Sequence, residues 1–267
     1  MTALYKYGEM TWQQIKDAAA AGRVAVVPVA TIEDHGLHLP VDTDVLLCTT
    51  ACERAVAQAP DRAVLVPPIN HGYSPHHMDF PGPITIGADT FIKYGVDVCK
   101  SLVAHGFRRV LIVNGHGSNT PFVDIIARLT VVETGALAAA VNYWAAPGVR
   151  QVAEALRDSE TGGMNHACEF ETSIYLALRP DLVDMSKAER DFTYNPSKNY
   201  WMDLVGGEGP LVMMEYWSAL SRSGVMGDPT KATAEKGERL LAAAAHGIVE
   251  LIDEMRSRRP AHRVDHH

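Results

Sequence analysis

The sequence predicts an α/β fold built on a mainly parallel β-sheet. Short apolar runs alternate with amphipathic stretches through about the first 180 residues, and this rhythm is typical of repeated strand–helix units. Three of the apolar runs lead directly into polar segments that are rich in metal-ligand side chains. Because ligands of open α/β sheets bind at the carboxyl ends of the strands, we expect these segments to meet at one rim and form one site.

Each predicted element has its own local signals. The predicted strands are the apolar runs Val24 to Val29, Ala63 to Val66, Val110 to Val113 and Leu137 to Val141. The predicted helices are Thr11 to Ala21, Val45 to Gln58, Thr90 to His105, Thr120 to Thr134, Ile174 to Leu178 and Ala232 to Met255. Thr11 is suited to capping the start of the first helix, and three helices end before a glycine that can adopt a left-handed conformation, namely Gly22, Gly106 and Gly135.

An irregular, aromatic-rich region at about residues 190–228 interrupts this pattern. It contains five glycines and the aromatic residues Tyr194, Tyr200, Trp201, Tyr216 and Trp217. A long irregular region inside a compact domain is usually functional or disordered, and the aromatic content argues against disorder. We predict that this region is a lid, a subunit contact, or both.

The composition excludes several classes of protein. The 267 residues carry a net charge of -8, and no clustered basic face of the kind that binds nucleic acid is expected. The sequence lacks both a basic-then-apolar N-terminus and an apolar stretch of about eighteen residues, so no membrane partner is expected. We predict one cytoplasmic domain spanning residues 1–267, with its four cysteines as reduced core thiols.

The first ligand-rich segment follows the strand Val24 to Val29. It holds six potential metal ligands within twelve residues: Glu33, Asp34, His35, His38, Asp42 and Asp44. Carboxylates and imidazoles together suit Zn²⁺, Mn²⁺ or Fe²⁺. A metal-dependent hydrolase is therefore the leading hypothesis from the residues alone.

Two further segments carry possible ligands. The turn Asn114-Gly115-His116-Gly117-Ser118-Asn119 again joins a strand to a helix, and its glycines permit a tight turn that projects His116. Phosphate binding is the alternative for a turn of this kind. In the third segment, His166 and Glu169 have the three-residue spacing of a helical metal site. Favourable placement of glutamate near a helix start is the alternative explanation there.

Together these segments resemble the creatininase (creatinine amidohydrolase) family. The resemblance rests on Glu33-x-His35-Gly36-x-His38-Leu39-Pro40 with Asp44, on Asn114-Gly115-His116-Gly117-x-Asn119, and on His166 with Glu171-Thr172-Ser173. Phe80-Pro81-Gly82 and the stretch Ala232 to Gly237 are also similar. The match runs in the same order over nearly the whole chain.

The resemblance implies a three-layer αβα sandwich, two divalent ions per subunit and a hexamer built as a trimer of dimers. Carried over by position, Glu33 and His116 would bind one metal ion and His35 the other, with Asp44 bridging both. His166 and Glu171 would be catalytic residues. The ions would be Zn²⁺, Mn²⁺ or Fe²⁺.

The sequence also departs from the creatinine-hydrolysing pattern. Ser118 stands where that enzyme has its last glutamate ligand, and we predict that Glu169 compensates as a metal ligand. Asn165 replaces a glutamate beside the catalytic histidine. Trp144 matches one pocket tryptophan, whereas a second tryptophan has no counterpart near Gly162. We expect the substrate to contact Trp144, His77, Ser118 and Asn119.

These features predict a hydrolase that uses a metal-bound hydroxide to attack a carbonyl of a small polar, cyclic substrate, in the manner of an amidohydrolase. The first alternative is hydrolytic C–C ring opening of a cyclic keto-polyol such as an oxidised inositol. The second alternative is a non-catalytic, metal-binding assembly protein that retains the fold.

Overall fold

A four-stranded parallel sheet forms the centre of the computed structural model, which describes residues 4–259 and 264–267. In spatial order the strands are β2 (Ala63–Leu65), β1 (Val24–Val29), β3 (Arg109–Asn114) and β4 (Leu137–Asn142). Strand β1 pairs in parallel with both β2 and β3, and β3 pairs in parallel with β4. The predicted parallel sheet is confirmed, with all four strands close to their expected positions.

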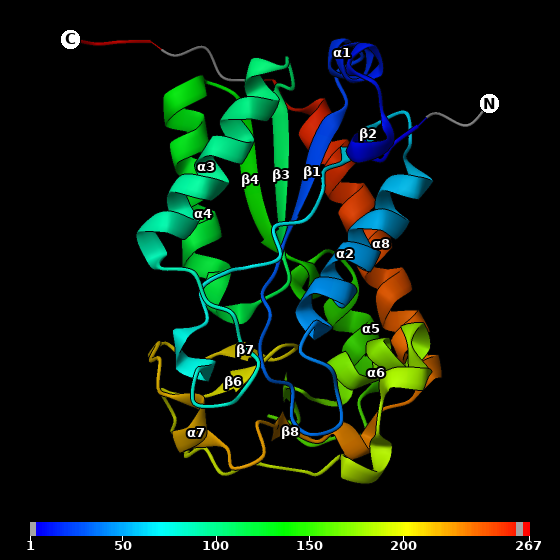
Figure 1. Cartoon of the computed structure of the whole chain (residues 1–267), viewed down its shortest axis with the longest axis vertical. Helices are drawn as coiled ribbons and strands as arrows, with labels where there is room; N and C mark the ends of the chain where they lie inside the picture. The colour runs from blue at the N-terminus through cyan, green and yellow to red at the C-terminus, as the bar shows by residue number, and fades with distance from the viewer. Residues whose placement is uncertain (1–3, 260–263) are drawn as a thin grey trace.

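Helices cover both faces of this sheet because successive strand side chains point to opposite sides. Val24 and Val26 of β1 pack into one core with α2 (Thr43–Gln58), α5 (Val149–Leu156), α6 (Glu169–Leu178) and α8 (Ala234–Ser257). Ala25, Val27 and Val29 pack into a second core with α1 (Trp12–Ala20), α3 (Ala88–Ala104) and α4 (Thr120–Thr134). Figure 1 shows the strands between α3 and α4 on one side and α2 and α8 on the other. The predicted three-layer αβα sandwich is confirmed.

Local signals in the sequence explain where several helices begin and end. Thr11 and Gln14 form a reciprocal capping box at the start of α1, in which the Thr11 backbone N–H donates to the Gln14 side chain at 2.7 Å. Gly135 ends α4 in a left-handed conformation with a φ of 69°. Helix α5 has no counterpart among the predicted elements because its eight residues carry too short a pattern.

The segment around His166 differs from its predicted conformation. His166 ends the short strand β5 (Met164–His166), and α6 begins only at Glu169. Between them Ala167 has a φ of 50°, in the left-handed region that residues other than glycine rarely adopt. Helix α6 therefore cannot extend back through this residue, and His166 and Glu169 do not share a helix face.

Small elements lie beyond the carboxyl ends of the sheet strands, at the end of the molecule opposite α1 (Figure 1). Strand β5 pairs antiparallel with β8 (Met226–Gly227), β6 (Met202–Asp203) pairs with β7 (Gly207–Glu208), and α7 (Trp217–Leu220) is a single turn.

The 3₁₀ turns are η1 (Tyr7–Glu9), η2 (Pro75–His77), η3 (Gly117–Asn119), η4 (Tyr143–Ala145), η5 (Pro180–Leu182), η6 (Met185–Lys187) and η7 (Pro229–Lys231).

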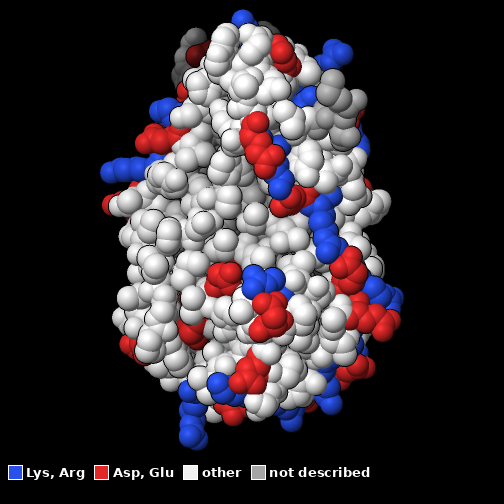
Figure 2. All heavy atoms as spheres, turned by 45° about the vertical axis from the view of Figure 1, so that its right-hand side comes forward, with Lys and Arg blue, Asp and Glu red and all other residues white. Residues whose placement is uncertain are grey.

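The surface agrees with the charge pattern of the sequence. On the face shown in Figure 2, acidic and basic side chains are interspersed, and no basic cluster stands out. Within the described ranges, none of the helices combines the length and apolar character that a membrane span requires. All four cysteines are buried and unpaired, as predicted.

The close crossing of α6 and α8 depends on Gly237, and this contact can be tested. A β-carbon at Gly237 would lie 1.8 Å from the backbone oxygen of Ser173, so Gly237→Ala must push the two helices apart. We expect the free energy of unfolding to fall by about 3 kcal/mol, as for overpacked core sites, measured by urea denaturation.

Gly8→Ala is the matched control, since a β-carbon at Gly8 would meet only Pro67, at 3.9 Å. Equal stability of the two variants would contradict the close crossing.

Candidate metal centre

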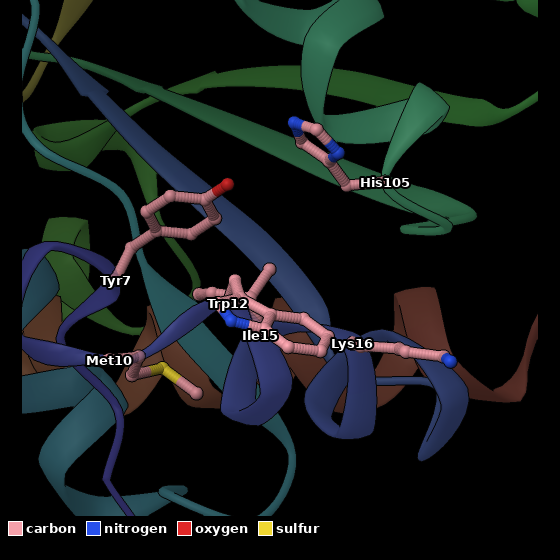
Figure 3. A pocket seen from close by; sticks show the side chains of 6 residues that line it. All are labelled: Tyr7, Met10, Trp12, Ile15, Lys16 and His105. Carbon is pink, nitrogen blue, oxygen red and sulfur yellow. The ribbon is translucent and has the colours of Figure 1, made fainter.

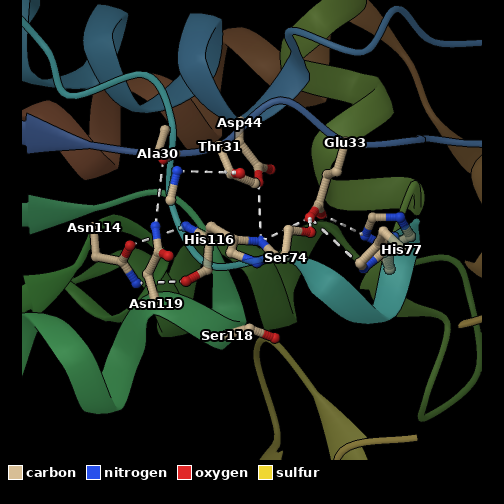
Figure 4. Close-up of polar contacts among 12 residues, drawn as sticks. Ala30, Thr31, Glu33, Asp44, Ser74, His77, Asn114, His116, Ser118 and Asn119 are labelled. Carbon is tan, nitrogen blue, oxygen red and sulfur yellow. Dashed lines mark hydrogen bonds and ion pairs between the residues drawn. The ribbon is translucent and has the colours of Figure 1, made fainter. Parts of the chain in front are cut away.

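The carboxyl ends of β1 and β3 bring three potential ligands to the start of α2. Glu33 follows β1, His116 follows β3, and Asp44 lies in the first turn of α2. Gly115 makes this approach possible, because a β-carbon there would lie 2.5 Å from Cys48 and 3.0 Å from the Asp44 backbone oxygen. The Nδ1 atom of His116 lies 3.2 Å from Oε2 of Glu33 and 3.1 Å from Oδ2 of Asp44 (Figure 4).

The second oxygen of Asp44 faces a different histidine. Oδ1 of Asp44 lies 3.3 Å from Nε2 of His35, and the same nitrogen lies 3.9 Å from Oε1 of Glu171. Among the described residues, three overlapping groups could hold a metal ion: Glu33, His35 and Asp44; His35, His166 and Glu171; and Glu33, His77 and His166. Asp44 lies between His35 and His116, with one carboxylate oxygen toward each ring.

The donor set fits divalent cations. Among the described residues, Nε2 of His35 and Oδ2 of Asp44 are buried and have no hydrogen-bond partner, which is costly unless another group satisfies them. Two ligand atoms that share a tetrahedral ion at ~2.1 Å lie about 3.4 Å apart. The nitrogen–oxygen distances of 3.1–3.9 Å in this cluster are close to that separation.

Neighbouring groups hold the ligands in place, as metal ligands require. Ser74 donates its hydroxyl to Oε2 of Glu33 at 2.6 Å. The side chain of Asn114 donates to the His116 carbonyl at 2.6 Å and accepts from the His116 backbone N–H at 3.2 Å. His38 contacts the hydroxyl of Thr172 at 2.9 Å, which agrees with a supporting role rather than ligation.

The electrostatics show how much positive charge the cluster requires. Burial alone would lower the pKa of His35, but Asp44 and Glu171 outweigh it and raise that pKa well above its usual value. Burial is likewise outweighed at His116, where Glu33 and Asp44 raise the pKa to about 10. Burial would raise the pKa of Glu33, but His116 and His77 lower it well below its usual range. Without metal, protons on the imidazoles balance the carboxylates.

Asp34 positions two further histidines at the edge of the cluster. Its carboxylate oxygen Oδ1 lies 2.6 Å from Nδ1 of His77, and its backbone carbonyl accepts from Nε2 of His166 at 2.8 Å. The remaining ring nitrogens, Nε2 of His77 and Nδ1 of His166, each lie 3.6 Å from an oxygen of Glu33. Burial, together with His35 and His77, lowers the pKa of His166 to about 4, so its ring is neutral at physiological pH.

The structure does not support the predicted role of Glu169 as a metal ligand. Its buried carboxylate accepts from the backbone N–H groups of Asp158 and Ser159 at 3.0 and 2.9 Å and from Nζ of Lys236 at 2.5 Å. These contacts tie α6 to α8. The carboxylate that reaches His35 is that of Glu171, two residues further along α6.

The four predicted substrate contacts have different surroundings. The Ser118 hydroxyl lies 2.9 Å from Nε2 of His76, and His77 borders Glu33. The Asn119 side chain accepts from the Tyr73 backbone at 2.9 Å and donates to the Ala30 carbonyl at 3.4 Å, so it joins loops. Trp144 packs against the core and against Tyr143, with ring centres 5.4 Å apart.

Three residues near the cluster have contacts that the sequence did not specify. They are Ser74, Asp34 and Trp217, whose ring stacks on His77. Asp34 belongs to the six potential ligands of its segment but contacts His77 instead, and Trp217 belongs to the region predicted as a lid or subunit contact. Ser74 lies in an irregular segment far from the ligands in sequence, where no local pattern identifies it.

A hollow of about 450 Å³ lies elsewhere, near the amino ends of β1 and β3. Figure 3 shows its lining residues, Tyr7, Met10, Trp12, Ile15, Lys16 and His105. None of them is a carboxylate, so this hollow lacks the donor set of the metal cluster.

Comparison with known proteins identifies the family. The model of the creatininase family, described as creatinine amidohydrolase, matches residues 8–252. The chain belongs to the creatininase family. This confirms the resemblance that the sequence predicted.

Similar proteins of known function are hydrolases. Creatinine amidohydrolase of Pseudomonas putida is 28% identical, over 92% of this chain and 95% of the relative. Mycofactocin precursor peptide peptidase of Mycolicibacterium smegmatis is 31% identical, over 86% and 84%. 3-Dehydro-scyllo-inosose hydrolase of Thermotoga maritima is 27% identical, over 97% and 86%. With the histidine and carboxylate cluster, these relatives confirm a metal-dependent hydrolase and argue against a non-catalytic protein.

Solved creatininases share the fold. A crystal structure of creatinine amidohydrolase has a TM-score of 0.78 and 28% identity and covers 94% of this chain and 98% of its own. A manganese creatininase and a Zn-Zn type mutant creatininase, each 28% identical, have TM-scores of 0.78 and 0.77. The former covers 94% of this chain and 98% of its own, the latter 93% and 97%.

The different surroundings of Glu169 and Glu171 lead to a testable contrast. Glu171→Gln should reduce the bound metal, because an amide is a weaker ligand than a carboxylate. Glu169→Gln should keep the metal but lower the free energy of unfolding by about 3 kcal/mol, because the largely buried Lys236 ammonium loses the buried one of its two carboxylate partners and keeps only the exposed Asp158. Metal content by mass spectrometry and urea denaturation measure the two effects. Loss of metal in the Glu169 variant alone would restore that residue as a ligand.

The raised pKa values of His35 and His116 predict that metal binding releases protons. Both imidazoles are protonated at pH 7 in the metal-free protein, and a ligand imidazole must give up its proton. The apparent affinity for Zn²⁺ should therefore rise with pH and fall on acidification, with about two protons released at pH 7. Calorimetry in buffers of different ionisation enthalpy measures this number. A binding enthalpy that is independent of the buffer would contradict the prediction.

Proposed function

We propose that this protein is a binuclear metal-dependent amidohydrolase that cleaves a C–N bond in a small polar, cyclic substrate. The observation that carries the proposal is the placement of Asp44, whose two carboxylate oxygens lie 3.1 Å from His116 and 3.3 Å from His35. A carboxylate between two sets of ligands is the arrangement that two-metal hydrolytic centres use.

The proposed ligands divide into two sets that share this carboxylate. Glu33, His116 and Asp44 would hold one divalent ion, and His35, Glu171 and Asp44 the other. Glu171, which the family resemblance implied as a catalytic residue, thereby becomes a proposed ligand, in the role first predicted for Glu169. The three carboxylates carry three negative charges against four positive charges on two ions, so the site comes close to neutrality. Divalent ions bound there would lower the pKa of a water molecule and polarise a substrate carbonyl.

His166 has the position and protonation state of a proton-transfer group. Its Nε2–H donates to the Asp34 carbonyl, which fixes the ring and leaves Nδ1 free. Because burial keeps the ring neutral, Nδ1 can accept a proton from the attacking water and pass it to the departing nitrogen. Asp34 orients this histidine through its backbone carbonyl and not through its carboxylate.

Two of the similar proteins favour hydrolysis of a C–N bond, because their names describe an amidohydrolase and a peptidase. The inosose hydrolase supports ring opening at a C–C bond as the second candidate. The hydroxyl of Ser118 and the ring of His76, 2.9 Å apart, would suit a hydroxyl-rich ligand of that kind.

A substrate panel separates the two reactions. We expect the Mn²⁺- or Zn²⁺-loaded protein to hydrolyse members of a set of lactams, imides and short peptides, but not oxidised inositols. Product formation is followed by mass spectrometry. Turnover of an oxidised inositol alone would reject the amidohydrolase and support the C–C reaction.

The role of His166 can be tested on any substrate found in this panel. His166→Asn should lower kcat by about 10²- to 10⁴-fold, the usual contribution of a positioned acid or base, and should leave both ions bound. His105→Asn is the control, since His105 lies at the far end of the sheet beside the hollow of Figure 3. Full activity of the His166 variant would remove it from the proton path.

The hexamer and the cytoplasmic location stay predictions. Support for subunit association comes from exposed apolar side chains in one short stretch, Leu211, Val212, Met213, Met214 and Tyr216. We expect light scattering to give six times the mass of the chain, and expect Val212→Lys to reduce it. A monomer at micromolar concentration would contradict the hexamer.

A further inference from the structure

An aromatic residue closes the proposed metal centre. The ring of Trp217 stacks on His77 with ring centres 4.6 Å apart and an interplanar angle of 23°. It also meets His166 at 4.8 Å and His76 at 5.9 Å. The ligand side chains beneath these histidines are themselves buried, so a substrate can reach them only if part of this cover moves.

Trp217 lies in a segment that is fastened at its base. The carboxylate of Asp191 accepts from the hydroxyls of Ser221 and Ser223 at 2.9 and 3.3 Å, and the backbones of Asp191 and Gly227 pair with each other. The segment of residues 192–220 therefore leaves the rest of the domain and returns to it at one point. Figure 1 shows this segment, with β6, β7 and α7, beyond the carboxyl ends of the sheet strands.

Two hydrogen bonds hold Trp217 over the histidines. Its indole Nε1–H donates to the Gly224 carbonyl at 3.2 Å, and the next residue, Ser218, donates its hydroxyl to Asp79 at 2.5 Å. Trp217 is only 8% exposed, whereas Val212 in the same segment is 80% exposed. The segment thus turns Trp217 toward the histidines while several neighbouring apolar side chains face solvent.

Packing within the segment accounts for only part of this burial. Trp217 shares a small core with Tyr194, Tyr200, Leu220 and Met226, yet one face of its ring lies against His77. A substrate that contacts His77 and His166 on the side facing Trp217 would also contact the indole. A space between two such ring systems accepts a flat group more readily than a puckered ring.

We propose that Trp217 is a substrate-contacting, specificity-determining residue, which selects a planar amide, lactam or imide that slides between the indole and the histidines. The inference rests on the proposed function, whose reaction supplies the amide. It narrows the substrate to a flat carbonyl compound and disfavours a polyol. Entry requires the Trp217 segment to move away from η2, and binding returns it over the substrate.

The first experiment uses Mn²⁺ alone as the probe. Paramagnetic Mn²⁺ in the centre should quench the fluorescence of the nearby indole in the unmodified protein. Trp217→Phe should abolish this quenching, and Trp201→Phe should keep it, because Trp201 is a half-buried tryptophan of the same segment that packs against Gly209 instead. Quenching that persists in Trp217→Phe, with metal still bound, would overturn the position of Trp217.

The second experiment measures affinity for succinimide, a planar imide, in the Mn²⁺-loaded protein. Trp217→Ala should weaken binding about tenfold, the equivalent of one aromatic contact, while Trp201→Phe binds as the unmodified protein does. If Trp217→Ala does not fold by circular dichroism, Trp217→Phe gives the same comparison with a smaller expected change. Equal affinity in all variants, or tighter binding of myo-inositol than of succinimide, would overturn the proposal.

These outcomes separate the inference from the proposed function. Succinimide binding that depends on Trp217, without turnover of any amide in the panel, would reject the amidohydrolase and leave the contact standing. Amide turnover with an affinity that is independent of Trp217 would reject the contact and leave the amidohydrolase standing.

Discussion

The burial of three carboxylates at one point is the constraint on which the rest of the site depends. Glu33, Asp44 and Glu171 are 1%, 3% and 7% exposed, and uncompensated charge at that depth costs several kcal/mol per ion. The neighbouring histidines can supply compensation only in part, since each added imidazolium repels the next. The carboxylates raise the pKa values of His35 and His116, while burial first, and then neighbouring histidines, lower the pKa values of His166 and His76. Divalent ions would satisfy the same carboxylates by direct coordination, which imidazolium rings cannot provide.

The fold meets the constraint by bringing ligands from separate segments to one rim of the sheet. Parallel pairing of β1 with β3 places the segments after Val29 and Asn114 side by side. The missing side chain of Gly115 then lets the β3 turn approach the start of α2, where Asp44 lies. Asp34 fixes the orientation of two more histidines, His77 through its carboxylate and His166 through its backbone carbonyl. The helices and sheet provide the rigidity, and the proposed ligands come from the loops after β1 and β3 and from the first turns of α2 and α6.

The elements and residues that could be predicted from the sequence are those with local causes. Strand β1 and helix α4 have the predicted bounds, because a continuous apolar run defines the first and Gly135 ends the second. Glu33, His35, Asp44 and His116 lie together as the family pattern implied. The ligand role predicted for Glu169 does not match its contacts, because its carboxylate pairs with Lys236, which is 67 residues away along the chain, and no spacing rule reveals such a pair. The position of His166 on a strand likewise depends on the left-handed conformation of Ala167, which is unusual for alanine.

This difference between local and distant contacts also explains the limit of the family assignment. Membership of the family indicates the chemistry more closely than it indicates the substrate. The proposed ion ligands come from short motifs next to regular elements, so their geometry follows from the sheet. The groups that would meet a substrate come from irregular segments: His76 from η2, Ser118 from η3 and Trp217 from the region after Asp191. Ser118 places a neutral hydroxyl 2.9 Å from Nε2 of His76, at a position where the creatinine-hydrolysing pattern has a carboxylate. His76 in turn lies beside Trp217, with ring centres 5.9 Å apart. The departure at Ser118 and the proposed aromatic cover therefore act on the same space.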